Sequence, residues 1–159
     1  MSEFSAILDN SVFLWCLLSC LFAQLFKIIF NFFLTGKIRF GIMFETGGMP
    51  SSHSALITGV TSGIGFQLGF DSSIFALAIA VSLIVMYDAS GVRKSAGMQA
   101  AEINKLSRKL DPKSEVDLKE TLGHTKIEVI VGSFLGPLIT LPGMVFIGSP
   151  LHILDLVLN

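Results

Sequence analysis

The amino-acid sequence predicts an all-α integral membrane protein, a helical bundle of about four transmembrane helices plus one amphipathic interfacial helix. Its 159 residues are 52% hydrophobic and only 14% charged, and the mean hydropathy is +0.73. A soluble domain carries about 25% charged residues, so this chain has too few to cover a water-facing surface. Apolar runs close to the ~20 residues that a helix needs to cross a bilayer recur along the chain. The length favours a single membrane domain over residues 1–159.

Four segments are predicted to span the membrane. Residues 11–34 form the longest apolar run, and residues 73–90 form the cleanest one. Residues 51–69 are rich in Ser, Thr, Gly and Ala, which suit close packing between helices inside a bundle. Residues 126–147 contain two prolines, which neighbouring helices tolerate within a membrane. The span count depends most on the second segment, because its small polar residues weaken the apolar signal.

A polar segment over residues 91–123 separates the third predicted span from the fourth. Its first part, residues 92–109, has the pattern of an amphipathic helix. The sequence LDPKSEVD (110–117) has the composition of a loop that ends this helix. We therefore expect a helix and a return loop outside the membrane core.

Positive charge lies on one side of the predicted bundle. Apart from Lys27, which falls inside the first span, every Lys and Arg lies in the loop 35–50 or in the segment 91–126. The positive-inside rule then places both basic segments in the cytoplasm and both termini outside. The N-terminus has no positively charged stretch and no small-residue cleavage site, so no cleaved signal peptide is expected.

This topology brings three polar motifs to the same membrane face. GGMPSSHSA (47–55) lies where the second span begins, YDASGVRK (87–94) where the third ends, and LGHTKIEV (122–129) where the fourth begins. Segments far apart in the sequence are thus expected at one depth. Their chemistry favours a single phosphate-handling site at that face.

The first motif suits an anion. Its glycines permit unusual backbone angles and close approach of a ligand, and Pro50 fixes the first helical turn. The free N–H groups and the dipole at a helix N-terminus favour a phosphate. One of Ser51 and Ser52 is expected to cap the helix, which does not exclude contact with phosphate. His53 follows one turn in, beside any bound anion.

The second motif supplies a cation at the end of an apolar helix. Arginine suits bidentate contact with phosphate, and we favour a functional role for Arg93 and for Asp88. The two are five residues apart, too far round a helix for a simple i,i+4 pair. Lys94, Arg108 and Lys109 are interpreted as a solvated or headgroup-facing surface.

The third motif pairs His124 with Glu128, four residues on, so that the two side chains share a helical face. A carboxylate bonded to one imidazole nitrogen fixes the tautomer and raises the basicity of the other nitrogen. Histidine nucleophiles and metal ligands both use this arrangement. By spacing alone, a helix-entry histidine beside a surface glutamate is an equal alternative.

Lys27 adds a charge inside the first span. Together with Cys20, Gln24 and Asn31 it follows helical spacing, so that one face of the helix carries a polar seam. A lysine within the membrane costs about 2.5–3.5 kcal/mol on insertion scales and by default marks function. Because Lys27 lies near the inner end of the span, snorkelling to the interface is the alternative.

Together, PSSHS, a downstream arginine and His-x-x-x-Glu resemble the type-2 phosphatidate phosphatase and vanadium haloperoxidase superfamily. GGMPSSHSA, YDASGVRKSAG, AEINKL and LKETLGHTKIEV look most like its small divergent branch of bacteria and plastids, from about Gln24 to Gly132. The resemblance implies a membrane protein related to acid phosphatases and vanadium-dependent haloperoxidases. It also implies location in a bacterial inner membrane or a plastid-type membrane.

The resemblance assigns roles to two of the motifs. The superfamily's Pro-Ser-Gly-His is matched by Pro-Ser-Ser-His, which implies that Ser51 binds phosphate and that Ser52 supplies a backbone N–H. His53 would then be the general acid for the leaving group. The end of a further motif, His-x-x-x-Asp, is matched by His124 and Glu128. This match implies a nucleophile and the carboxylate that orients it.

Two arginine positions of the superfamily are not matched. Asp117 and Leu118 occupy the Ser-Arg half of the motif that ends in His-x-x-x-Asp, with Lys119 adjacent but not equivalent. Leu34 stands where a third motif, Lys-x₆-Arg-Pro, requires its arginine after Lys27. Charge stabilisation dominates catalysis of this kind, so other cations would have to replace the missing arginines.

The first hypothesis is a metal-independent membrane phosphatase, a hydrolase for a lipid phosphate or pyrophosphate. His124 attacks phosphorus, Glu128 orients it, and His53 protonates the leaving group. Water then hydrolyses the phosphohistidine. The residues expected to hold the phosphate are Ser51, Ser52, Arg93, Lys27 and Lys105, with Asp88 and Lys119 in support.

The second hypothesis is a catalytically degenerate membrane protein that binds anionic lipid headgroups or a partner, and it follows from the missing arginines. A small transporter fits less well, because the polar residues gather at one face instead of along a path. No metal and no cofactor are expected; vanadate would enter only as a phosphate analogue. Cys16 and Cys20 cannot by themselves close a structural zinc site and are interpreted as packing residues. A membrane lipid is the expected partner and nucleic acid is not, and a homo-oligomer is compatible with the sequence.

Overall fold

The computed structural model describes residues 7, 9–43, 47–111 and 117–148. Within these ranges every regular element is a helix, so the predicted all-α class is confirmed. The elements are α2 (Ser11–Thr35), the short 3₁₀ helix η1 (Phe40–Met43), α3 (Ser52–Leu68), α4 (Ser73–Ser90), α5 (Val92–Leu110) and α6 (Lys126–Phe146). Helices α2, α3, α4 and α6 coincide closely with the four apolar segments of the sequence.

Side-chain caps fix where the bundle helices begin. Asn10, Ser51, Ser72 and Thr125 each accept a hydrogen bond from the backbone N–H three residues on. Such a cap satisfies one of the amide groups that a first helical turn leaves without a partner, and it typically contributes ~1 kcal/mol. The caps set the starting points of α3 and α6, and these two starts carry the polar motifs.

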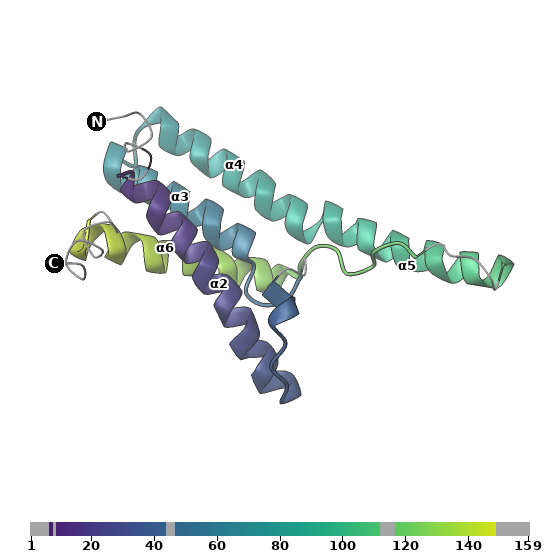
Figure 1. Ribbon diagram of the computed structural model, residues 1–159. Helices are drawn as coiled ribbons and strands as arrows, with labels where there is room; N and C mark the ends of the chain where they lie inside the picture. Colours follow the sequence, from purple (N-terminus) through teal and green to yellow (C-terminus); the bar gives the residue numbers. More distant parts are fainter. Residues whose placement is uncertain (1–6, 8, 44–46, 112–116, 149–159) are drawn as a thin grey trace.

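Helix α3 is the centre of the bundle and packs on α2, α4 and α6 (Figure 1). The contact with α6 is close because both helices present small residues. A Cβ added to Gly136 would lie 2.3 Å from the carbonyl oxygen of Ala55, and one added to Gly132 would lie 2.3 Å from that of Ser51. Small residues that allow such approach are typical of helix packing within membranes, where van der Waals contact replaces the hydrophobic effect.

Among the described residues, three helical segments are long and apolar enough to cross a membrane. They are α2, the rod Ser73–Leu110 that combines α4 and α5, and α6. Helix α3 has 17 residues and is not among them. The structure therefore supports three of the four predicted spans, and the crossing by α3 stays a prediction.

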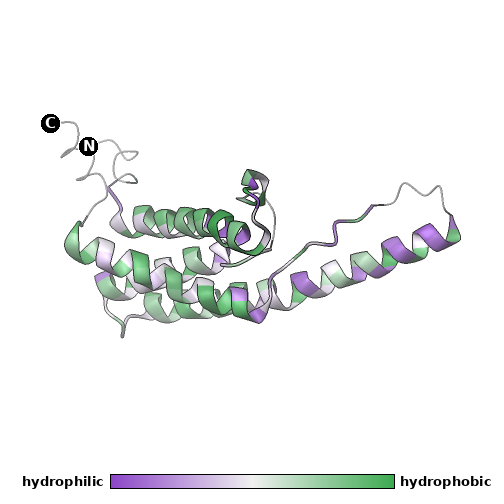
Figure 2. Ribbon diagram, turned by 90° about the horizontal axis from the view of Figure 1, so that it is seen from below, coloured by the Kyte–Doolittle hydropathy of each residue, from purple (hydrophilic) through white to green (hydrophobic). Residues whose placement is uncertain are grey.

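Helix α5 continues the direction of α4 and extends beyond the bundle (Figures 1 and 2). Hydrophilic residues gather on α5, whereas the bundle is largely hydrophobic (Figure 2). The predicted amphipathic helix is thus present, and it extends from a spanning helix; its interfacial position stays a prediction. Most of the predicted loop 110–117 lies outside the described residues.

Residues 117–121 run back along α5 and are held there by Asn104. The Asn104 side chain is buried, its Nδ2 donates to the Leu118 carbonyl oxygen at 2.8 Å, and its Oδ1 accepts from the Leu118 amide at 2.9 Å. Nδ2 also donates to Oε1 of Glu120 at 2.9 Å. The Asn104 side chain thereby hydrogen-bonds both the N–H and the C=O of Leu118, in a segment that belongs to no helix.

Candidate functional site

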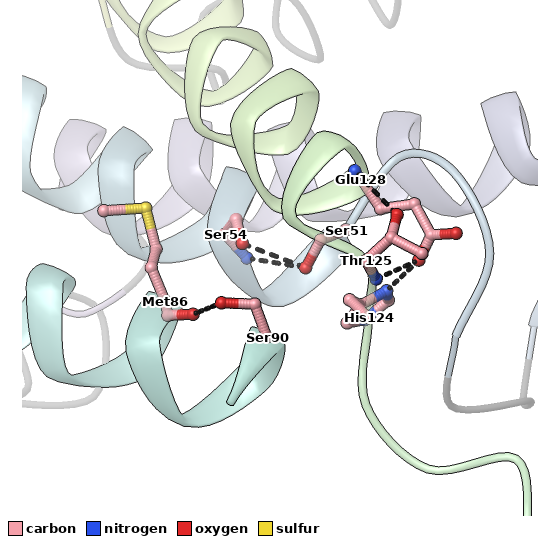
Figure 3. A network of polar contacts seen from close by, with 7 residues as sticks. All are labelled: Ser51, Ser54, Met86, Ser90, His124, Thr125 and Glu128. Carbon is pink, nitrogen blue, oxygen red and sulfur yellow. Dashed lines mark hydrogen bonds and ion pairs between the residues drawn. The ribbon is translucent and has the colours of Figure 1, made fainter. Parts of the chain in front are cut away.

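Two backbone hydrogen bonds bring the three polar motifs together. The Ser51 amide at the start of α3 donates to the Glu128 carbonyl oxygen of α6 at 3.0 Å. The His124 amide, just before α6, donates to the Ala89 carbonyl oxygen near the end of α4 at 2.8 Å. Figure 3 shows these helix ends side by side. We call the group formed by Ser51, Ala89, His124, Thr125 and Glu128 the junction.

Gly123 allows the chain to reach α4 at this point. Its φ of +77° is in the left-handed region that favours glycine. A Cβ there would lie 2.5 Å from the Lys94 amide nitrogen and 2.9 Å from the Ala89 carbonyl oxygen. A larger residue would therefore push the following His124 away from the end of α4.

His124 and Glu128 form the pair that the sequence pattern suggested. His124 is 6% exposed, and its Nδ1 lies 3.1 Å from Oε2 of Glu128. The same carboxylate oxygen accepts a hydrogen bond from the Thr125 amide at 3.1 Å, while Thr125 Oγ1 accepts one from the Glu128 amide at 3.3 Å. This reciprocal capping box holds the carboxylate against the imidazole (Figure 3).

Thr125 is a positioning residue that sequence reasoning missed. The signal was present, because Thr-x-x-Glu directly before an apolar run is the pattern of a capping box. The motif therefore does two things with one carboxylate: it starts α6 and it orients His124.

Burial lowers the pKa of His124 below its ordinary value of 6.5. The hydrogen bond to Glu128 raises this pKa and the charge of Lys27 lowers it, but burial is the largest effect. His124 is therefore neutral at neutral pH. With Nδ1–H donating to the carboxylate, Nε2 keeps the electron pair that a nucleophile needs.

A small cavity of about 30 Å³ joins the second histidine to this pair. It has room for roughly two water molecules. Its walls come from α3, α4, α5 and the segment before α6. The lining residues are His53, Val85, Asp88, Ala89, Arg93, Gly123 and His124. Both histidines and the arginine singled out from the sequence thus line one space, which we call the phosphate pocket after the ligand that the sequence predicts.

Arg93 and Asp88 form an ion pair at the edge of this pocket, with side chains 54% and 35% exposed. A continuous helix would separate residues five apart, but α4 and α5 are interrupted at Gly91, whose φ and ψ are −109° and −84°. This break lets the guanidinium turn back onto the carboxylate. The spacing argument missed the contact because it assumed one regular helix.

Ser51 and Ser52 are both buried. The Ser51 hydroxyl oxygen accepts hydrogen bonds from the Ser54 amide at 3.3 Å and from the Ser54 hydroxyl at 3.0 Å, so Ser51 is the expected cap (Figure 3). Its hydroxyl faces into the helix start. Contact with an anion at this end would come from the first-turn backbone N–H groups of Ser52 and His53.

Lys27 is buried at 3% exposure, which favours a place in the polar seam over snorkelling to the interface. It lines a second cavity of about 200 Å³ together with Gly48 and Glu128. Its charge acts on both His53 and His124. Asn31, predicted in the same polar seam, donates its Nδ2 to the Lys37 carbonyl oxygen at 3.2 Å and closes the end of α2.

Lys105 and Lys119 lie apart from the phosphate pocket. Lys105 follows Arg93 on α5 by about 18 Å along the helix axis. Its Nζ lies 3.7 Å from Glu102 Oε2, and both side chains are exposed. Lys119 is exposed on the segment that returns along α5. Asp117, which stands at the superfamily's serine position, lies 3.4 Å from Arg108.

Comparison with known proteins gives three findings. An "uncharacterized membrane protein YuiD" from Bacillus subtilis (strain 168) is 38% identical over 149 residues, which cover 85% of this chain and 94% of that relative. No solved structure matches the chain. The model of the Divergent PAP2 family matches residues 8–139, a range that holds all three polar motifs. The protein is therefore a membrane protein that belongs to the Divergent PAP2 family.

Proposed function

We propose that the protein is a membrane phosphatase that hydrolyses a lipid phosphate or pyrophosphate through a phosphohistidine intermediate. The observation that carries the proposal is the phosphate pocket, where His124, oriented by Glu128, shares one space with His53 and Arg93. A nucleophile, its orienting carboxylate, a candidate acid and a cation are the parts that phosphoryl transfer to histidine requires.

In the first step the phosphate group displaces Asp88 from Arg93, whose planar guanidinium binds two phosphate oxygens. The first-turn N–H groups of α3 bind a third. His124 Nε2 attacks phosphorus, and the bond from phosphorus to the leaving oxygen breaks. His53, which takes up a proton when the negatively charged phosphate binds beside it, donates that proton to the leaving oxygen. In the second step water attacks the phosphohistidine, His53 takes the proton from the water, and phosphate leaves.

Glu128 stabilises the positive charge that the His124 ring carries as the phosphorus–nitrogen bond forms. Lys27 lies on the other side of this carboxylate, where its charge opposes protonation of His124 in the resting protein. We assign the cationic stabilisation of the phosphate charge to Arg93 and Lys27. Lys105 and Lys119, which the sequence also suggested, are left out of the proposal because both are exposed and lie apart from the pocket.

We further propose that the phosphate pocket faces the cytoplasm. Of the 11 Lys and Arg residues, all except Lys27 lie in the two segments that join the helices at the pocket-bearing end. The positive-inside rule places these segments on the cytoplasmic side and the termini outside.

Binding without turnover is the second candidate. It is supported by the buried Ser51 hydroxyl, which caps α3 instead of facing the pocket, and by the small volume of the pocket. In that case the protein would hold an anionic headgroup at Arg93 without transferring phosphate to His124.

Phosphate release by detergent-purified protein tests the proposal, with a panel of lipid phosphates and pyrophosphates and no added metal. We expect release from at least one lipid, loss of release in His124→Ala, and full release in His152→Ala, a matched histidine control outside the described residues. Release that persists in His124→Ala would refute the mechanism. Arg93-dependent headgroup binding with no release from any lipid would establish the second candidate.

A further inference from the structure

A groove lies next to the phosphate pocket, deeper in the bundle. Helix α3 packs against both α4 and α6, whereas α4 and α6 make little contact with each other. The space between them is a cavity of about 350 Å³ that Ile79, Leu83 and Met86 of α4 line, with Thr61 of α3 and Ser133 of α6. We call it the α4–α6 groove.

The hydroxyl groups in this groove are already hydrogen-bonded inside the protein. Thr61 and Ser82 bond to each other at 2.6 Å, and Thr58 donates to the Ser54 carbonyl oxygen at 2.8 Å. Ser133 donates to the Ile130 carbonyl oxygen at 2.7 Å, and Ser62 to that of Gly59 at 3.0 Å. The groove therefore presents apolar surface in spite of its serines and threonines, and its chemistry fits hydrocarbon.

The groove and the phosphate pocket are neighbours on one helix. Met86 lines the groove, and Ala89, three residues on and on the same face of α4, lines the pocket. Figure 3 shows Met86 and Ser90 of α4 beside the start of α3, where the pocket begins. A ligand with a phosphate at one end and an apolar chain at the other could occupy both spaces.

An aromatic pair closes the far end of the groove. The rings of Phe70 and Phe75 pack edge to face with centroids 5.1 Å apart. They lie directly on Gly65, since a Cβ there would come within 2.5 Å of the Phe70 ring and 2.8 Å of the Phe75 ring. The chain would therefore end against these rings.

The distance from the end of α4 to this aromatic pair sets the length of the hydrocarbon chain that the groove can hold. Phe75 lies roughly 22 Å along the axis from the end of α4 at Ser90. Half of a hydrocarbon core that is ~30 Å thick is about 15 Å. With Ser90 at the edge of the hydrocarbon core, the groove would therefore reach past the bilayer midplane, farther than a chain confined to one leaflet.

We propose that the α4–α6 groove holds the hydrocarbon chain of the substrate, and that the substrate is a single-chain lipid phosphate whose chain is long enough to pass the bilayer midplane. The volume of the groove, about 350 Å³, is near the lower end of the range of about 300–1,000 Å³ for ligand pockets, which suits one chain. This inference rests on the proposed function of the phosphate pocket.

Chain-length preference tests the proposal through a matched pair of tryptophan variants on α4. Ile79 lines the groove, while Leu77 is 63% exposed and does not line it. With single-chain lipid phosphates of long and short chains, Ile79→Trp should lower the long-to-short ratio of kcat/KM at least tenfold, and Leu77→Trp should leave it unchanged. Continued turnover of the short chain shows that Ile79→Trp is folded. An unchanged ratio in that variant would overturn the proposal.

A binding experiment separates this inference from the phosphatase itself. The probe is a non-hydrolysable single-chain phosphonate with a photoreactive group near the end of its chain. We expect labelling within residues 70–83, reduced by Ile79→Trp and not by Leu77→Trp. Such labelling without phosphate release from any lipid would retain the groove as a chain site and remove the proposed activity. Phosphate release with labelling confined to other helices would support the proposed activity and would remove the groove as a chain site.

Discussion

The junction and the projecting arm, formed by residues 95–110 of α5 and residues 117–121, are both rich in polar residues, but the structure treats them in opposite ways. In the junction, Ser51 and His124 are buried, and backbone hydrogen bonds from three helix ends hold them together. In the arm, the charged side chains are exposed and pair locally, as Lys105 does with Glu102. Polar residues alone therefore do not mark the site; burial and convergence do.

The phosphate pocket also distinguishes two cations that look alike in the sequence, Arg93 and Lys105. Arg93 and Lys105 are similarly exposed, at 54% and 63% of their side chains, and each has an acidic partner. Exposed pairs of this kind contribute only about 0–1 kcal/mol to stability. What distinguishes Arg93 is that it also lines the space shared by His53 and His124.

The sharpest test of this difference compares Arg93→Ala with Lys105→Ala. Loss of the pocket cation should lower kcat/KM for phosphate release roughly 10²–10³-fold, because it removes a donor to the charge that develops on phosphate. Lys105→Ala should stay within about twofold, since its ion pair is exposed and remote from the pocket. Equal losses in the two variants would show that the arm belongs to the site.

A smaller effect is expected when Glu128 becomes glutamine. The substitution keeps a hydrogen-bond acceptor but removes the charge, so kcat/KM should fall roughly 10–100-fold. The wild-type activity should decline on the acid side only below pH 6.5, since the pKa of His124 is lowered. Because Glu128 raises that pKa, Glu128→Gln should move the acid limb to still lower pH.

The matched control is Glu102→Gln, which changes an exposed carboxylate of the arm. Neither its rate nor its pH profile should differ from the wild type. An acid limb that moves upward in Glu128→Gln would mean that His124 is not the titrating group, and the assignment of the nucleophile would then fail.

The sequence predicted the convergence of the motifs because topology alone decides which helix ends share a membrane face. It also suggested the pair of His124 and Glu128, although His124 lies just before α6 and the capping box of Thr125 and Glu128 brings the carboxylate to it. Lys105 shows where such reasoning stops. Whether a polar segment folds over the site or extends away from it depends on the direction in which α5 leaves α4, and the break at Gly91 sets that direction.

Other differences between the sequence predictions and the structure have local causes. The pair of Asp88 and Arg93 depends on the same break at Gly91, which five-residue spacing in a regular helix does not allow for. One of Ser51 and Ser52 was expected to cap α3, and Ser51 is the cap, while the contact of its hydroxyl with phosphate stays a prediction. Such outcomes depend on side-chain direction, and a motif specifies only residue type and spacing.

Two glycines with positive φ, Gly123 and Gly36, allow a test of how the junction is held in place. Gly123 and Gly36 have φ of +77° and +67°, but a Cβ on Gly36 would meet nothing within 4 Å. Both alanine variants share a left-handed strain of about 1–2 kcal/mol. Only Gly123→Ala adds a collision with backbone atoms of Lys94 and Ala89, so it should also lower turnover, by roughly tenfold for a shift of the nucleophile.

Thermal unfolding and kcat/KM, measured on both glycine variants, distinguish the two contributions. Gly36→Ala should lose some stability and keep its turnover. If Gly123→Ala also keeps full turnover, the close approach of this glycine to α4 does not position His124.

The smallest effect on activity is expected from Asn104→Ala in the arm. This substitution removes three hydrogen bonds and leaves the Leu118 amide and carbonyl without partners, a local cost of about 1–3 kcal/mol. Hydrogen exchange of the Leu118 amide should accelerate roughly tenfold or more, because ~1.4 kcal/mol corresponds to a factor of ten. The His124 amide, bonded to Ala89 in the junction, should exchange at its wild-type rate, and turnover should stay within about twofold. Gln99→Ala, an exposed change on the same helix, should alter neither amide. Faster exchange at His124 in Asn104→Ala would show that the arm supports the junction, and the two regions would then have to be treated as one unit.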